Sequence, residues 1–184
     1  MLQVTKAEDV IDHGLSLGAD FAELFVERSL TNAISTLSSQ VQSVESGIDF
    51  GIGVRLVFGS KVLYGYTNKT EAEELKRIMG ELAAMDLRDP RVSLQAFDYS
   101  APVEHHPAHR ILSADADVDS KVAYLMAADA AARASSNLIS QTRGACRQKE
   151  QRIEIFNSEG LHTTDARNYV RATLTAIASD GQDQ

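Results

Sequence analysis

The 184-residue sequence has few of the residues that mark secreted, membrane-spanning or nucleic-acid-binding proteins. Tryptophan is absent, aromatic residues make up 6% of the chain, and Cys146 is its one cysteine. A lone cysteine excludes an internal disulfide framework and is typical of a reducing compartment. No run approaches the roughly 18 apolar residues of a transmembrane helix, and the first nine residues carry acids where a signal peptide has an apolar core. We therefore expect a cytoplasmic protein that does not contact the membrane.

Positive charge is scarce as well. The chain has 18 Lys and Arg against 26 Asp and Glu, a net charge of −8. Phosphate contacts need clustered basic residues, but here the densest basic group is interrupted by Glu150 and Glu154. That group comprises Arg143, Arg147, Lys149 and Arg152. We therefore expect no direct binding of nucleic acid, and the low aromatic content also argues against a base-stacking platform.

The first part of the sequence predicts a short helix followed by strands. Residues 6–17 have helical spacing of apolar residues and end before Gly18. Strands are then expected at 21–28, 33–39, 41–45, 50–58 and 61–67. Apolar residues alternate from Phe50 to Phe58, which is typical of a strand with one buried face. Gly51 and Gly53 point to the other face, where we expect close packing against the backbone.

A connector is expected in the middle of the chain. Thr70-Glu-Ala-Glu has the form of a capping box and predicts a helix to about Met85. Residues 86–112 hold all three prolines and three of the five histidines, without a sustained period. They predict a connector between an N-terminal lobe, 1–85, and a second lobe, 113–184, unless the two lobes form one continuous domain of a longer protein.

The second lobe is expected to contain a long helix and three strands. Asp117 or Asp119 caps the helix, which runs to about Ser135. The strands are expected at 138–147, 152–156 and 161–179. One face of the last strand carries apolar residues: Val170, Ala172, Leu174, Ala176 and Ala178. Because such a strand needs a neighbour and the sequence stops soon after it, we expect the front part of a longer protein.

The expected fold class follows from this order of elements: helix, five strands, helix, connector, helix, three strands. Runs of strands between helices favour antiparallel sheets with helices on one face. The sequence therefore predicts an α+β fold with mostly antiparallel sheets, two long helices and a short N-terminal helix.

Several local patterns resemble functional motifs but lack the context that their chemistry needs. Gly14-Leu-Ser-Leu-Gly18 matches the nucleophile elbow of hydrolases, but a helix precedes it and a strand follows, so we interpret it as a helix C-terminus. In His105-His106-Pro-Ala-His109 the outer histidines have the spacing of zinc ligands. Pro107 breaks such a helix and no glutamate follows either histidine, so a surface connector is expected.

Two further patterns fail in the same way. Asp115-Ala-Asp-Val-Asp119 imitates a calcium loop, but Ser120 and Met126 replace its glycine and its bidentate glutamate. These acids are expected to cap a helix. Gly51-Ile-Gly53 is half a dinucleotide fingerprint inside a continuous strand. Cys146 has no clear partner base and is expected to pack inertly. The sequence thus predicts no catalytic, cofactor-binding or metal-ligating residue in this chain.

Three segments, taken together and in order, resemble a known family. They are Gly18-Ala-Asp-Phe-Ala-Glu-Leu-Phe-Val-Glu27, Gly51-Ile-Gly-Val-Arg-Leu-Val-Phe-Gly59 and Gly65-Tyr-Thr-Asn68. They resemble the amino-terminal domain of the TldD/PmbA family, whose members are described as metalloproteases and as modulators of DNA gyrase. Thr164–Arg171 looks like the same domain continuing, and Arg167 and Arg171 make the TldD branch look closer than the PmbA branch.

The resemblance implies that catalysis lies outside this chain. The zinc site of the family is a His-Glu-x-x-x-His helix with a later cysteine, both in a carboxy-terminal domain. This sequence has no His-Glu pair, so no metal or catalytic residue is carried over, and Cys146 is not the family's cysteine. We expect zinc in the carboxy-terminal domain and an inactive chain when this part is alone.

The function implied is that of an amino-terminal, non-catalytic domain of a TldD-like zinc metalloprotease. It would help to enclose unfolded or extended peptides, by a strand wall or by edge pairing, and to form a homodimer or a heterodimer with a PmbA-like subunit. The alternative is a non-catalytic interaction module, either PmbA-like or a naturally short partner of a full-length protease. A small-molecule-binding domain is a third hypothesis, which no motif supports.

Overall fold

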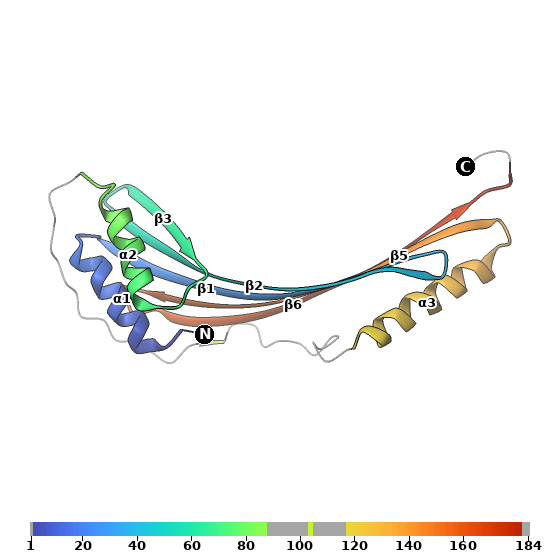
Figure 1. Ribbon diagram of the computed structural model, residues 1–184, viewed down its shortest axis with the longest axis horizontal. Coiled ribbons are helices and arrows are strands. Elements are labelled where there is room, and N and C mark those ends of the chain that lie inside the picture. The colour runs from blue at the N-terminus through green and yellow to red at the C-terminus, as the bar shows by residue number, and fades with distance from the viewer. Residues whose placement is uncertain (1, 88–102, 105–116, 182–184) are drawn as a thin grey trace. The chain divides into compact units, whose positions relative to one another are not determined.

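A computed structural model of the chain describes residues 2–87, 103–104 and 117–181 (Figure 1). Over these residues three helices and six strands are present, and the α+β class is confirmed. In chain order they are α1 (Val4–Ser16), β1 (Phe21–Leu37), β2 (Gln40–Phe58), β3 (Lys61–Thr67), α2 (Ala72–Ala83), β4 (Val103–Glu104), α3 (Val118–Ser135), β5 (Ile139–Asn157) and β6 (His162–Ala178). Of the expected connector, 86–112, only 86–87 and 103–104 are among the described residues.

The strands form a sheet in the order β3-β2-β1-β5-β6-β4. Its five long strands are antiparallel; between β2 and β3 the register runs from Ile52 opposite Thr67 to Phe58 opposite Lys61. The short β4 pairs in parallel with β6 at Thr163 and Thr164. The consecutive strands β1, β2 and β3 therefore pair as hairpins, as do β5 and β6, and β1 pairs with the distant β5 between these two groups.

The strands are fewer and longer than the sequence suggests. β1 joins the expected strands 21–28 and 33–39, β2 joins 41–45 and 50–58, and β5 joins 138–147 and 152–156. The cause is visible in residues 40–49 of β2, which are exposed on both faces apart from Ser43. A strand without a buried face shows no alternation of apolar residues, although its backbone remains paired.

The chain forms two compact units, and both are assembled from separate segments of sequence. Of the described residues, unit 1 takes 2–28, 49–87, 103–104 and 152–166, and unit 2 takes 29–48, 117–151 and 167–181. β1, β2, β5 and β6 each supply residues to both units.

Unit 1 is held by an apolar core between its helices and one face of its strands. The predicted alternation in β2 is confirmed, since Ile52, Val54, Leu56 and Phe58 are 0–3% exposed. From the helices, the buried residues include Val10, Ile11, Leu75 and Met79. The helices α1 and α2 contact each other, and α2 contacts β3 (Figure 1). Each large side chain buried in this way contributes about 1.5–3 kcal/mol of transfer free energy.

Close approach between helix and sheet occurs at glycines other than the expected ones. A Cβ atom at Gly51 or Gly53 would meet its nearest neighbour at 3.7 or 3.8 Å, an ordinary contact, so the expected tight packing there is wrong. At Gly14 the nearest atom would be 2.9 Å away, and at Gly65 it would be Ile78 Cγ2 at 2.5 Å. These two glycines therefore set how closely the helices pack.

The helix ends show which local signals act. Gly18 follows α1 with a φ of 92°, as expected for a helix stop. Glu71, and not Thr70, occupies the N-cap of α2, and no side-chain hydrogen bond caps it, so the predicted capping box is wrong. Asp117 does cap α3, because its carboxylate accepts the Ser120 N–H at 2.7 Å. Hydrogen bonding from Ser120 also lowers the pKa of Asp117.

Unit 1 also buries a polar pair. Glu154 and His162 side chains are 5% and 7% exposed, with Oε1 3.0 Å from Nε2. The second carboxylate oxygen of Glu154 accepts the backbone N–H of Leu2 at 3.1 Å. The ring of His162 stacks on Phe156, with centroids 4.2 Å apart. The pair thereby ties the start of the chain to β5 and β6.

Unit 2 has a much smaller apolar core. It consists of Ile34 from β1, Leu125 from α3 and Cys146 from β5, with Val122 packed against them. α3 approaches the strands where Gly144 leaves space, since a Cβ there would overlap Thr36 Oγ1 and lie 3.4 Å from Leu125 Cδ2 of α3. In β6 the expected apolar face is largely exposed: Val170 and Leu174 are half-buried, whereas Ala172, Ala176 and Ala178 are exposed.

A buried carboxylate adds to this small core. Asp129 on α3 is 4% exposed and accepts hydrogen bonds from Ser39 Oγ at 2.6 Å, from Thr142 Oγ1 and from Arg133 Nε at 3.3 Å. The hydrogen bond from Ser39, then that from Thr142, lowers the pKa of Asp129. Ser38 and Ser39 have φ of 45° and 65° and form the turn between β1 and β2. The turn between β1 and β2 is thereby hydrogen-bonded to α3.

No helix within residues 2–87 or 117–181 combines the length and apolarity needed to cross a membrane.

We predict that Gly65→Ala destabilises unit 1 by about 1–3 kcal/mol, because the new methyl group overlaps Ile78 Cγ2. The matched control is Gly80→Ala in α2, where nothing lies within 4 Å of an added Cβ. Because alanine has a higher helix propensity than glycine, Gly80→Ala should raise the free energy of unfolding by about 0.5–1 kcal/mol. Urea unfolding measures both, and equal effects of the two variants would contradict the close approach at Gly65.

We predict that Asp129→Asn lowers the free energy of unfolding at pH 7 by about 1–3 kcal/mol, because the buried network loses charge-assisted hydrogen bonds. The pKa of Asp129 lies below its usual value of 3.8 in the folded state. Its contribution is therefore complete above about pH 4 and is lost as the pH falls through the folded pKa. Urea unfolding between pH 7 and pH 3 should show the difference from wild type shrinking. Asp119→Asn, at an exposed position of α3, is the control, and a pH-independent loss for Asp129→Asn would contradict the prediction.

Candidate functional site

Unit 2 exposes one face of its strands opposite α3. On β5, Thr142, Gly144, Cys146 and Gln148 are buried, and the contacts of Leu125 with Gly144 and Cys146 place this set on the α3 side. The residues between them point the other way because side chains alternate along a strand. We call this other side the helix-free face, and it carries exposed Arg147 and half-buried Lys149.

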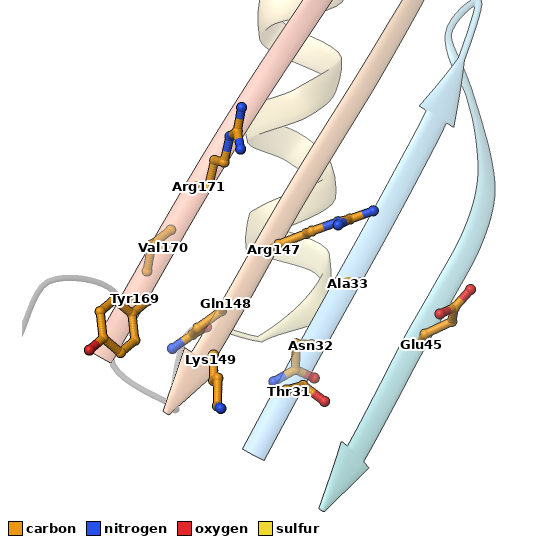
Figure 2. Close-up of a pocket in the computed structure, with 10 residues that line it drawn as sticks. All are labelled: Thr31, Asn32, Ala33, Glu45, Arg147, Gln148, Lys149, Tyr169, Val170 and Arg171. Atoms are coloured by element: carbon orange, nitrogen blue, oxygen red, sulfur yellow. The ribbon is translucent and has the colours of Figure 1, made fainter. Parts of the chain in front are cut away.

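The helix-free face contains a depression of about 530 Å³ that is built by four strands (Figure 2). Its ten described lining residues are Thr31, Asn32 and Ala33 on β1, Glu45 on β2, Arg147, Gln148 and Lys149 on β5, and Tyr169, Val170 and Arg171 on β6. All ten belong to unit 2. Figure 2 shows the strands side by side, with α3 behind them and the side chains of Arg147 and Arg171 extending from neighbouring strands.

Hydrogen bonds beside the depression hold its strands in place. Thr31 Oγ1 donates to the carbonyl of Gly47 at 3.4 Å, and the hydroxyls of Ser35 and Ser43 lie 2.7 Å apart, so β1 is fixed against β2. Gln148 Nε2 donates to Asn168 Oδ1 at 3.3 Å, which joins β5 to β6. The neighbours of these residues, Arg147 and Tyr169 among them, therefore have fixed positions along their strands.

The charge of the depression is opposite to that of the whole chain. Among its ten described lining residues, Arg147, Lys149 and Arg171 are basic and Glu45 is acidic. The net charge of the chain is −8. Basic side chains gathered on one surface attract anions and bind carboxylates or phosphates through charge-assisted hydrogen bonds. The depression is therefore suited to binding an anionic group.

The residues that the sequence singled out do not gather at this depression. Ser16 is the last residue of α1 and donates to the carbonyl of His13 at 2.7 Å, so the helix C-terminus interpretation is confirmed. Asp117 caps α3, with Asp119 in the first turn, as expected. Cys146 is buried against Ile34 and Leu125, which confirms its packing role. Gly51 and Gly53 lie within β2.

His105, His106, His109 and Asp115 lie outside the described residues. Within residues 2–87, 103–104 and 117–181, no group of three or more His, Cys, Asp or Glu side chains is placed to hold a metal ion. The buried acids are engaged elsewhere, Asp129 with Ser39 and Glu154 with His162. The described residues therefore do not fit a catalytic zinc ion, which needs three protein ligands.

Sequence reasoning missed the depression because its residues are distant in the chain. In the sequence, Arg147 and Lys149 belong to a basic group that glutamates interrupt, and Arg171 belongs to the segment Thr164–Arg171 that carries the family resemblance. The available signal was the spacing of two residues between Arg147 and Lys149 and between Tyr169 and Arg171, which puts each pair on one strand face. Only the pairing of β5 with β6 brings the two pairs together.

Comparison with known proteins gives the relatives of this fold. The family model described as PmbA/TldA metallopeptidase domain 1 matches residues 22–85. The model described as PmbA/TldA metallopeptidase central domain matches residues 111–184. No curated protein matches the chain.

Solved structures share the fold at low sequence identity. A proposed modulator of DNA gyrase from Bacteroides thetaiotaomicron matches with a TM-score of 0.72 and 13% identity, over 98% of this chain and 42% of that chain. A second proposed modulator of DNA gyrase, from Thermotoga maritima, matches with a TM-score of 0.76 and 10% identity, over 97% of this chain and 40% of that chain. TldE from Thermococcus kodakarensis matches with a TM-score of 0.67 and 17% identity, over 96% of this chain and 40% of that chain.

This chain therefore spans about two fifths of the length of the solved chains that it matches. The two family models lie in order along it, domain 1 before the central domain. The two family models, which together cover residues 22–85 and 111–184, show that the chain belongs to the PmbA/TldD family and corresponds to its amino-terminal part.

Proposed function

We propose that this chain is the non-catalytic amino-terminal part of a TldD-like zinc metallopeptidase and that its sheet helps to enclose an extended peptide substrate. The observation that carries the proposal is the match of two metallopeptidase domains of one family along the chain. Within the part of the chain that the structure describes, no group of three or more His, Cys, Asp or Glu side chains is placed to hold a metal ion, and the proposal assigns to this chain a role in holding substrate.

The helix-free face supports a role in substrate binding. It is a strand surface that no described helix of unit 2 covers, and it contains a depression of about 530 Å³. Substrate sites are concave and combine a few polar groups with apolar lining. The depression meets this description with Tyr169 and Ala33 beside the basic groups. An extended peptide lying on this face would contact side chains from β1, β5 and β6.

Zinc and the carboxylate that activates water are proposed to come from a carboxy-terminal domain. Zinc bound there would polarise the scissile carbonyl and activate a water molecule. The working assembly is proposed to be a cytoplasmic homodimer, or a heterodimer with a PmbA-like subunit. The solved chains that this chain matches are longer, since it spans 40–42% of their length.

We predict that the purified 184-residue chain binds zinc well below one equivalent and does not cleave an unfolded protein such as reduced casein. Metal analysis after dialysis and gel-based proteolysis assays measure these quantities, with a full-length family member as the positive control. Stoichiometric zinc or robust proteolysis by the chain would contradict the proposal.

The intact mass of the native protein from its source cells, with peptide mapping beyond Gln184, separates the proposal from its alternative. A heavier protein with a His-Glu-x-x-x-His peptide supports the metallopeptidase. A native protein that ends at Gln184 would favour the non-catalytic interaction module.

A further inference from the structure

We infer that Arg147 and Arg171 form a carboxylate-binding site, through which the helix-free face prefers acidic segments of an extended polypeptide. The inference rests on the proposed function, because it assumes that a peptide reaches this face. It adds the chemical class of the preferred peptide and names the residues that select it.

Both arginines are available to a ligand. They are exposed, and neither forms an ion pair with a described residue. Other described arginines are engaged: Arg55 with Glu23 at 3.0 Å and Arg133 with Asp129 at 3.3 Å. An unpaired guanidinium offers its whole planar fork of N–H donors to a ligand.

The arrangement of the two arginines suits adjacent carboxylates. They extend from neighbouring strands into one depression, as Figure 2 shows, and Lys149 and Tyr169 lie two residues away on the same strands. Lys149 adds positive charge, and Tyr169, which is 52% exposed, offers a ring surface for the aliphatic part of a bound side chain. A single carboxylate can be held bidentately by one arginine, and two can be held by both.

Glu45 makes the charge of the depression differ between its two sides. It lines the depression from β2, separated from the arginines of β5 and β6 by the strand β1. A carboxylate placed near Glu45 is repelled, whereas one placed over β5 and β6 is attracted. Acidic side chains of the bound peptide therefore lie over β5 and β6.

The rest of the chain favours a peptide over a nucleic acid as the source of the anion. The net charge is −8 and the basic residues outside this face are dispersed, so a long polyanion is repelled over most of the surface. A short peptide segment with two or three carboxylates contacts only the basic region. Tyr169 is the single aromatic residue among the ten described lining residues, which is too little for a stacking platform.

The test compares two labelled ten-residue peptides of equal length, one with three glutamates and one with glutamines in their place, both amidated at the C-terminus. Fluorescence anisotropy with the 184-residue chain measures their dissociation constants at 50 and 200 mM salt. We expect the acidic peptide to bind about tenfold more tightly at low salt, with a smaller difference at high salt. A glutamine peptide with a free C-terminus distinguishes side-chain carboxylates from the terminal carboxylate.

The double variant Arg147→Gln/Arg171→Gln should abolish the preference for the acidic peptide and leave binding of the glutamine peptide unchanged. The charge-matched control is Lys61→Gln/Lys69→Gln, which removes two exposed positive charges from unit 1 and should keep the preference. A further variant, Arg147→Glu/Arg171→Glu, should reverse the preference toward a lysine peptide. Circular dichroism and thermal unfolding verify that each variant folds.

Three results would overturn the inference. Equal binding of the acidic and glutamine peptides removes the charge preference, although measurable binding of both peptides still supports peptide enclosure. An equal loss of preference in the Lys61/Lys69 control shows a general charge effect. Tighter binding of a ten-nucleotide thymidine strand than of the acidic peptide, lost in the arginine double variant, assigns the site to nucleic acid.

Discussion

The alternation of side chains along strands is the constraint on which both units depend. In unit 1 it gathers Ile52, Val54, Leu56 and Phe58 on one face, which α1 and α2 then cover. Burial of this face is the main source of stability, because the apolar area removed from water is largest there. The same alternation sends the remaining side chains of each strand to the opposite side. A strand that supplies side chains to a core therefore also supplies side chains to the opposite face. Core packing does not constrain the residue types on that face, so they can bind a ligand.

Unit 2 applies the same rule with different chemistry. Its apolar core of Ile34, Leu125 and Cys146 is small, and a buried carboxylate connects helix, turn and strand where a larger core would have apolar contacts. Hydrogen-bonded networks of this kind specify a geometry but contribute less net free energy than burial of large side chains. The network around Asp129 fixes the positions of α3 and the strands. This suits a sheet whose helix-free face carries the cationic side chains of the depression.

The sequence was most informative where a strand buries one face. The alternation at 50–58, the stop at Gly18 and the cap at Asp117 are all local, and all three are confirmed. The continuity of β1, β2 and β5 could not be predicted because the stretches that join the expected strands, 29–32, 46–49 and 148–151, are largely polar and carry no apolar alternation, although the backbone stays in the strand through them. The depression was beyond reach for a related reason: it combines Ala33 with Arg147 and Arg171, which only strand pairing brings together.

The position of Cys146 has a practical consequence. Cys146 is 5% exposed and packs against Leu125 of α3, and the sequence contains no other cysteine. A thiol-reactive dye can therefore label the folded chain only when this helix moves away from the strands. The labelling rate then reports the frequency of that opening, in the manner of amide exchange at a single site. The molecule thus carries a built-in kinetic probe of its smaller core, which requires no engineered residue.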